Sequence, residues 1–393
     1  MRRRFFSNKT VEKIDLSKNY FKIEALEDGL TSKLTINTCE YCIDDGSWIK
    51  LPPSENTIPI NKGQILSFRG NLQSSISSRV GTFTISKKCN LKGNIMSLLH
   101  KDDFEEQTDL VGKSYAFSEL FYNCTNIVDA SELILPATTL ADGCYSDMFR
   151  GCTSLTQAPE LPATTLADGC YQYMFYDCTS LVSAPELPAT TLVRNCYQYM
   201  FDGCTSLVSA PELPATTLVR NCYQYMFDGC TSLVSAPELP ATTLVKNCYQ
   251  YMFYDCTSLV SAPELPATTL ADRCYYNMFN GCTSLTTAPA LPATTLAALC
   301  YYRMFTYCES LTQAPELPAT TLADRCYYEM FNCCTKLNYI KALFTTTPSN
   351  TNTYTHNWVY GVSSTGTFIK NKNATWNVTG NNGIPSGWTV QTA

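Results

Sequence analysis

A period of 26 residues runs from about residue 135 to about residue 340, and it restricts the possible folds more than any other feature of this sequence. Each copy contains the segment Leu-Pro-Ala-Thr-Thr-Leu, and residues 186–211 recur without a change as residues 212–237. The repeated prolines are Pro136, Pro162, Pro188, Pro214, Pro240, Pro266, Pro292 and Pro318. A fixed period of roughly 20–29 residues with recurring leucines is typical of a leucine-rich solenoid, in which stacked coils bury an interior that no single coil can bury alone.

Each unit divides into a strand-like part and a helix-like part. The TSLVSAP segment suits a short strand that pairs in parallel with its copies, about 4.8 Å away. Proline removes a backbone donor, so Pro185 and Pro211 mark where such strands end. A threonine of LPATTL can cap a helical turn, and CYQYMFYDC carries apolar residues at helical spacing. The sequence therefore predicts an α/β fold, a right-handed solenoid of eight full coils after a degenerate first one at SYAFSELFYNCTNIV.

The segments on either side of the repeat predict further units. Residues 20–90 contain short alternating runs separated by Asp45-Gly46 and Lys62-Gly63, which are turn signals between strands. After the repeat, NWVYGV and GTFIK suggest two strands with Trp358 and Phe368 pointing inward, as expected of a cover for the last coil. The predicted units are a basic arm or anchor (1–19), a small β-sandwich (20–98), the solenoid (99–340) and a terminal β cap (341–393). A merely solvated tail is the alternative for the arm.

Charge and hydropathy exclude several classes of partner. The net charge of −6 and the pI near 5.1 argue against nucleic acid, whose phosphate backbone requires a basic surface. No apolar run reaches the roughly 18–20 residues that span a bilayer. Three arginines near the start imitate a signal peptide, but no apolar stretch follows them. We therefore expect no membrane span and no secretion signal in the chain as written, so that an extracellular role requires another exit, such as release of particles by lysis.

The repeat also resembles a known family. The pattern F-x-x-C-T-S-L…P-x-L-P, carried by Phe175, Cys178, Leu181, Pro185 and Leu187 and their equivalents, is similar to the BspA-like leucine-rich repeats over about residues 114–340. The flanking segments resemble those of such proteins in gut Bacteroidales and their phages. The resemblance implies surface display and adhesion, without catalysis.

The 21 cysteines lie mostly in the repeat, in pairs eight residues apart such as Cys170 and Cys178. If the segment between them is helical, it spans about 12 Å, and a disulfide needs Cα atoms within about 7 Å. Disulfides within a coil are therefore not expected, although the geometry does not exclude disulfides between equivalent cysteines of adjacent coils. The simpler expectation is two ladders of buried thiols. With two histidines in the chain, and Cys39-x-x-Cys42 lacking a second pair, we expect no metal and no cofactor.

A row of glutamates follows the repeat proline and raises the question of catalysis. Its members are Glu160, Glu186, Glu212, Glu238, Glu264 and Glu316, with Ala290 interrupting the series. Stacked coils would bring neighbouring carboxylates near the roughly 5 Å separation of a retaining glycosidase pair. A catalytic pair needs two different environments, which a uniform row does not provide. No G-x-S-x-G motif or phosphate-binding glycine loop is present either, so we expect no enzyme and interpret the row as a solvated edge, with a cation-binding strip as the alternative.

Three positions of the unit vary while the framework holds, and tyrosine recurs at each of them. Positions that exchange Tyr for Arg, Asn or Asp are expected to be exposed, and exposed tyrosines offer contact area and a hydroxyl at low entropic cost. The predicted ligand surface comprises Tyr173, Tyr199, Tyr225, Tyr251, Tyr176, Tyr254, Tyr276, Tyr302 and Tyr328. The alternative is ordinary surface drift after duplication. A polar row on the strand side, which includes Gln157 and Ser183, could also contact a ligand or only water.

These observations together predict a non-enzymatic protein for surface recognition or adhesion that binds a bacterial or host surface glycan or protein. One setting is a phage virion protein, a fibre or capsid decoration, in which the N-terminal unit contacts other virion proteins. Free thiols favour this setting, because a particle assembles in a reducing cytoplasm. The alternatives are a bacterial cell-surface adhesin, a glycan-active enzyme and a passive spacer.

Overall fold

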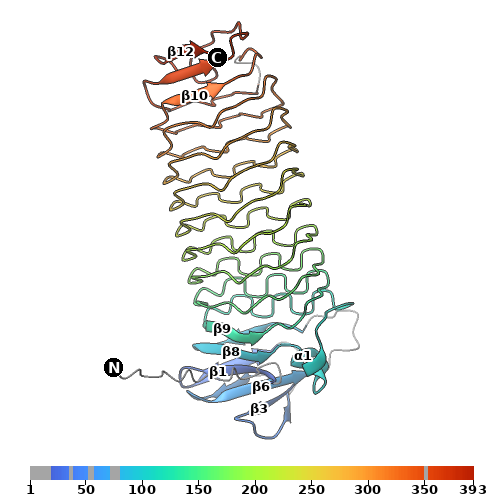
Figure 1. Cartoon of the computed structure of the whole chain (residues 1–393). Coiled ribbons are helices and arrows are strands. Elements are labelled where there is room, and N and C mark those ends of the chain that lie inside the picture. The colour runs from blue at the N-terminus through green and yellow to red at the C-terminus, as the bar shows by residue number, and fades with distance from the viewer. Residues whose placement is uncertain (1–18, 35–38, 52–56, 71–79, 349–352) are drawn as a thin grey trace, which may run out of the picture.

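The repeats form one elongated stack of coils in a computed structural model of the chain (Figure 1). The structure describes residues 19–34, 39–51, 57–70, 80–348 and 353–393. Strands cover the N-terminal end of the stack, and three further strands lie at the C-terminal end. The predicted basic arm, except for Asn19, lies outside the described residues.

Each coil consists of turns, so the helical segment predicted for CYQYMFYDC is wrong. Within the described residues the helices are limited to α1 (Ser97–His100) and the 3-10 helix η2 (Phe104–Glu106), both before the repeats. In the coil that begins near residue 160, Gly169, Tyr173 and Asp177 have φ values of 61°, 57° and 56°. Residues of left-handed conformation cannot continue a right-handed helix. A left-handed residue at every fourth position therefore breaks the segment into successive turns.

Backbone hydrogen bonds in these turns alternate between two directions. The amide of Met174 donates to the carbonyl of Tyr171 at 3.2 Å and closes a turn within the coil. The amides on either side, of Tyr173 and Phe175, donate to carbonyls of the next coil at 3.1 and 3.0 Å. The amides of this segment thus find partners without a helix or a continuous strand.

The strand predicted for TSLVSAP is reduced to single parallel bridges between successive coils. Ser183 pairs in parallel with Ser209, and the amide of Val208 donates to the carbonyl of Val182 at 3.1 Å. Proline two residues after the serine ends the pairing, as its missing donor requires. Along the following LPATTL segment, side chains alternate between the interior and the solvent, with Leu187 buried and Pro188 exposed.

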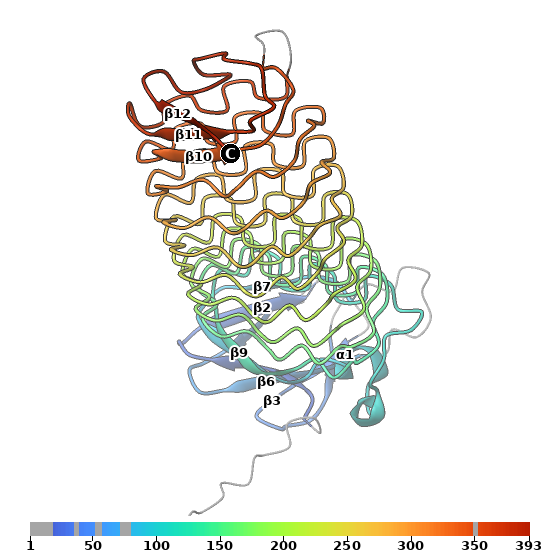
Figure 2. The ribbon, with the colours of Figure 1, turned by 45° about the horizontal axis from the view of Figure 1, so that its top comes forward.

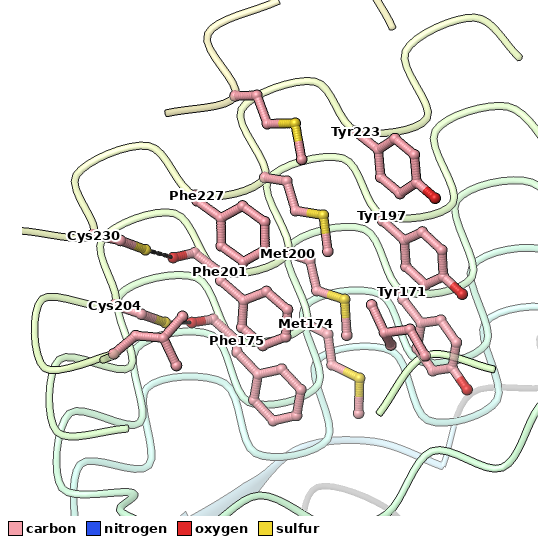
Figure 3. Packing of buried hydrophobic residues seen from close by; sticks show 14 of the residues in the cluster. Tyr171, Met174, Phe175, Tyr197, Met200, Phe201, Cys204, Tyr223, Phe227 and Cys230 are labelled. Carbon is pink, nitrogen blue, oxygen red and sulfur yellow. Dashed lines mark hydrogen bonds between the residues drawn. The ribbon is translucent and has the colours of Figure 1, made fainter. Parts of the chain in front are cut away.

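Identical side chains stack on one another in the interior of the solenoid (Figure 3). The rings of Phe175 and Phe201 lie 5.6 Å apart and 3° from parallel, while a neighbouring row of tyrosines contains Tyr197. The thiol of Cys204 donates to the carbonyl of Phe175, at 3.1 Å, and every later coil repeats this bond. The second cysteine of the unit therefore has a structural role, because it gives a buried carbonyl an additional donor.

The N-terminal end contains two sheets. The strands are β1 (Phe21–Ala25), β2 (Leu30–Leu34), β3 (Cys39–Ile43), β4 (Ile49–Lys50), β5 (Thr57–Ile60), β6 (Ile65–Gly70), β7 (Phe83–Ile85), β8 (Cys89–Asn94) and β9 (Ile127–Ile134). One sheet has the order β4-β3-β6-β1-β8-β9, and the other has the order β5-β2-β7. Phe21 and Phe68 of the first contact Phe83 of the second, with ring centroids 5.5 and 5.1 Å apart.

This end is hydrogen-bonded into the solenoid. β8 pairs in parallel with β9, which lies beyond the boundary predicted at residue 98, and Asp129 of β9 then bridges to Gln157 of the next coil. The interior is continuous as well, because Phe121 stacks between Phe83 and Phe149 at 5.6 and 5.2 Å. Figure 2 shows the N-terminal strands lying against the first coils.

The C-terminal end continues the stack with a parallel sheet. Its strands are β10 (Tyr339–Ala342), β11 (Thr367–Lys370) and β12 (Thr389–Thr392), in that order. Trp358 and Phe368 are fully buried, as predicted. Of the two predicted strands, only GTFIK forms one; NWVYGV forms turns that continue the last coil.

Candidate recognition surface

A row of stacked aromatic rings follows one face of the solenoid. We call it the aromatic ladder, and it consists of Tyr173, Tyr199, Tyr225, Tyr251, Tyr276, Tyr302, Tyr328 and His356. It contains seven of the nine tyrosines predicted as a ligand surface. The first four occupy a left-handed backbone position, with φ between 57° and 59°.

Ring spacing in the ladder is close and regular except at one step. The centroids of Tyr199 and Tyr225 lie 4.4 Å apart with planes 10° from parallel, and Tyr276 and Tyr302 lie 4.5 Å apart at 2°. Between Tyr251 and Tyr276 the spacing is 5.4 Å and the planes are tilted by 49°. The irregular step occurs there because Asn277 replaces tyrosine and the preceding position, which is glutamine in earlier coils, becomes Tyr276.

Stacking determines which part of each ring a ligand can reach. All the ladder tyrosines are half-buried, where the sequence predicted exposed positions, because each ring covers the faces of its neighbours. Ring edges and hydroxyls therefore offer the contact surface within the ladder, and ring faces do not. Burial raises the pKa of Tyr199 to about 12, so its phenol is a neutral hydrogen-bond donor near pH 7.

An arginine contacts the aromatic ladder near each of its two ends. The guanidinium of Arg150 lies 5.1 Å from the ring centre of Tyr173 and 4.6 Å from that of Tyr176, and Asp147 holds it at 3.0 Å. Near the other end, Arg303 lies 5.3 Å from the ring centre of Tyr302 and pairs with Glu329. Cation–π contacts of this kind fix the side chains in place.

Comparison with known proteins agrees with this architecture. A family model described as the BspA type leucine-rich repeat region matches residues 117–260 and 170–312, with 6 copies. This chain belongs to the BspA-type leucine-rich repeat family. Membership indicates a surface or adhesion-type repeat protein, in a family whose solenoids generally serve as binding scaffolds.

The two other comparisons give little information beyond family membership. None of the curated proteins matches the chain. Among solved structures, the chain is similar to a TLR13–ssRNA13 complex at 13% identity and a TM-score of 0.27, over 62% of this chain and 31% of that one. The BspA-type chain thus spans about a third of the length of that chain.

The two remaining predicted tyrosines flank a short acidic row. Tyr176 lies 5.8 Å from Tyr173, and Tyr254 lies 5.4 Å from Tyr251, both as ring-centroid distances. Asp202 and Asp228 occupy the two positions between Tyr176 and Tyr254 in the stack. Burial and repulsion by Asp228 raise the pKa of Asp202 to about 8, and burial and Asp255 raise that of Asp228 to about 7. The sequence marked this column as variable, but burial between tyrosines could not be foreseen.

A row of glutamine amides runs beside the ladder, and the sequence analysis did not identify it as a hydrogen-bonded ladder. The amide of Gln172 donates to Gln198 at 2.6 Å, Gln198 donates to Gln224 at 2.6 Å, and Gln224 donates to Gln250 at 2.8 Å. Side-chain amides that satisfy one another between coils keep the adjacent tyrosines in register. The sequence signal that could have identified this row is the glutamine that occupies the same position in four consecutive units.

The predicted glutamate row lies on another side of the coil. Glu212 and Glu238 are exposed and border a hollow that is lined by Pro211 and Pro237. Glu316 pairs with Lys341 at 3.0 Å. Within the described residues, no three His, Cys, Asp or Glu side chains are placed to share a metal ion.

The cysteines are free, and Cys333 alone among them is not fully buried. Burial raises the pKa of Cys144 to about 12, which keeps the thiol protonated and unreactive. No described helix has the length and apolar character needed to cross a membrane.

Proposed function

We propose that the aromatic ladder of this BspA-type protein binds glycans or proteins of bacterial or host surfaces, without catalysis. The observation that supports this most is the row of eight aromatic rings, which presents ring edges at centroid distances of 4.4–4.9 Å over six of its seven steps and 5.4 Å between Tyr251 and Tyr276. A surface of this kind suits a repeating ligand, because the coils from Tyr173 to Tyr251 add one contact each at one position and those from Tyr276 to Tyr328 add one each at the neighbouring position.

The chemistry of the ladder favours a ligand rich in hydrogen-bonding groups. Sugar rings that stack on aromatic faces would find those faces covered. Phenol hydroxyls and glutamine amides can instead bond the hydroxyls of a glycan or the peptide groups of an extended segment.

We further propose that the protein is carried on a phage particle, as a fibre or capsid decoration, with its N-terminal end toward other virion proteins. Buried free thiols support this setting, since they suit assembly in a reducing cytoplasm. Mass spectrometry of purified virions should then detect the chain. Detection only in bacterial cell-surface fractions would instead indicate a cellular adhesin.

Binding of the purified protein to whole gut bacteria and to a glycan array tests the ladder. The variant Tyr199→Phe/Tyr225→Phe/Tyr251→Phe keeps the rings and removes three hydroxyls, so we expect affinity to fall about tenfold or more. Val208→Thr/Val234→Thr, which changes exposed residues in another column, is the matched control and should bind as the parent does. Equal binding by all three proteins would exclude the ladder as the site.

A further inference from the structure

The protein contains two parallel rows of stacked tyrosines that differ in spacing and in access to solvent. In the ladder, the pairs Tyr173–Tyr199, Tyr199–Tyr225 and Tyr225–Tyr251 have centroid distances of 4.6, 4.4 and 4.4 Å. In the interior row, Tyr171–Tyr197, Tyr197–Tyr223 and Tyr223–Tyr249 are each 5.9 Å apart. The interior rings are at most 1% exposed, whereas the ladder rings are half-buried with their edges outward.

Close stacking places equivalent ring atoms of neighbouring coils near one another. Rings only 10° from parallel that occupy the same position in identical coils are related by little more than a translation. The ring carbon ortho to the phenol oxygen (Cε1 or Cε2) of Tyr199 therefore lies about one centroid distance from its counterpart in Tyr225. Such carbons carry unpaired spin when a phenol loses a hydrogen atom, and two of them can join.

We propose that the aromatic ladder is a site of oxidative cross-linking, in which neighbouring tyrosines of successive coils form dityrosine when a haem peroxidase and hydrogen peroxide supply the oxidant. Each of two phenols loses one electron and one proton. The two radicals form one carbon–carbon bond, and the hydrogens displaced from the joined carbons restore the two phenol hydroxyls. One peroxide takes up the two electrons and two protons and becomes two waters. This modification does not depend on the ligand proposed above.

The arrangement favours bonds within one molecule. Each ladder ring has a partner ring in contact, so a radical meets a neighbour of its own chain before it meets another protein. The spacing also allows an unpaired electron to pass between adjacent rings until two radicals meet. Bonds of this kind would tie each coil to the next and make the surface more resistant to unfolding and proteolysis.

Peptide mapping can locate the bonds. Cleavage after Arg194, Arg220, Lys246 and Arg273 gives the peptides 195–220, 221–246 and 247–273, each with one ladder and one interior tyrosine, and the third also contains Tyr254. The first two differ only in their last residue, which distinguishes them by mass. After peroxidase treatment of the native full-length chain, we expect dityrosine fluorescence from monomeric protein, and linked pairs of neighbouring peptides whose mass is reduced by two hydrogens.

Two matched substitutions assign the bonds to one row. Tyr225→Phe keeps the ring but removes the phenol, and it should abolish both links to peptide 221–246. Tyr223→Phe makes the same change in the interior row of the same coil and should leave both links in place. The proposal is wrong if treated protein carries dityrosine only in dimers and larger species, if it gains none, or if the links survive in Tyr225→Phe and disappear in Tyr223→Phe. Circular dichroism of both variants confirms that they fold.

Discussion

At the scale of single residues, the left-handed backbone positions explain much of the sequence. One such column contains Gly203, Gly229 and Gly281, with Asp177 and Asp255 at other coils, and another contains the ladder tyrosines Tyr173 to Tyr251. A left-handed conformation costs a residue other than glycine roughly 1–2 kcal/mol. Tyrosine is held there at four successive coils because the next coil bonds its amide and stacks on its ring. At Gly203 and Gly281 glycine has a second reason, which is the close approach of an aspartate side chain from the preceding coil.

Two glycines of that column provide a matched comparison. A Cβ added at Gly203 would overlap Oδ1 of Asp177, whereas at Gly229 the nearest atoms lie 3.7 Å away. Gly229→Ala should therefore cost only its backbone strain, about 1 kcal/mol, and Gly203→Ala should cost more in urea denaturation. Adding Asp177→Ala to Gly203→Ala should remove the excess. Equal costs for the two single variants would contradict the packing described for this column.

The half-buried Asp202 and Asp228 predict that the stability of the protein depends on pH. The folded pKa values of Asp202 and Asp228, about 8 and about 7, lie above the ordinary value of 3.8. Between about pH 4 and pH 8 the folded state thus holds protons that the unfolded state has lost, so the free energy of unfolding falls as pH rises. Asp202→Asn/Asp228→Asn should flatten this decline and stabilise the protein by roughly 1–2 kcal/mol at pH 8. Urea titrations of the parent and the variant at pH 5 and pH 8 measure the free energy of unfolding at each pH. An equal decline between the two pH values in parent and variant would contradict this prediction.

At the scale of the coil, the sequence predicted the repeat and the buried rows, but not the local conformation. The inward residues Cys170, Tyr171, Met174, Phe175 and Cys178 recur every four positions, which is close to the 3.6-residue period of a helix. Only the hydrogen bonds to neighbouring coils distinguish turns from a helix, and those depend on stacking. The aromatic ladder was predicted as a surface, but the covering of its ring faces follows from spacing between coils, which no single unit encodes.

The cysteine rows lead to a prediction about the framework of the coil. Cys230→Ala removes a buried sulfur and its bond to the carbonyl of Phe201, and we expect it to lower the free energy of unfolding by about 1–2 kcal/mol. Val234→Thr, at an exposed position of the same coil, should change it by less than about 0.5 kcal/mol. Similar urea midpoints for the two variants would mean that the thiol row contributes nothing.

At the scale of the whole molecule, the solenoid is a one-dimensional stack in which each coil contacts only its neighbours. The hydrogen-bonded ends extend this stack, since β8 pairs with β9 and β10 pairs with β11. The interior row of phenylalanines passes through it from Phe83 to Phe331. Stability should therefore be roughly the sum of similar interfaces.

Deleting residues 186–211 tests that additivity. The segment is identical to residues 212–237, so every remaining interface stays native, and Tyr173 would stack on Tyr225. We expect a folded protein with an unchanged circular dichroism shape, a shorter maximum dimension in small-angle scattering and a slightly lower urea midpoint. Deleting only residues 186–198 should unfold the chain, because later coils lose their register. Loss of folding in the full-coil deletion would contradict a modular stack.

The central claim, that consecutive units pile into one body with a dry interior of free thiols, is tested most directly by counting reactive thiols without reductant. The account predicts that the native protein exposes one slowly reacting thiol, that of Cys333, and that denaturation reveals all 21. Rapid labelling of many thiols in the native protein would contradict the stacking of the coils, and fewer than 21 after denaturation would reveal disulfides in place of the buried rows.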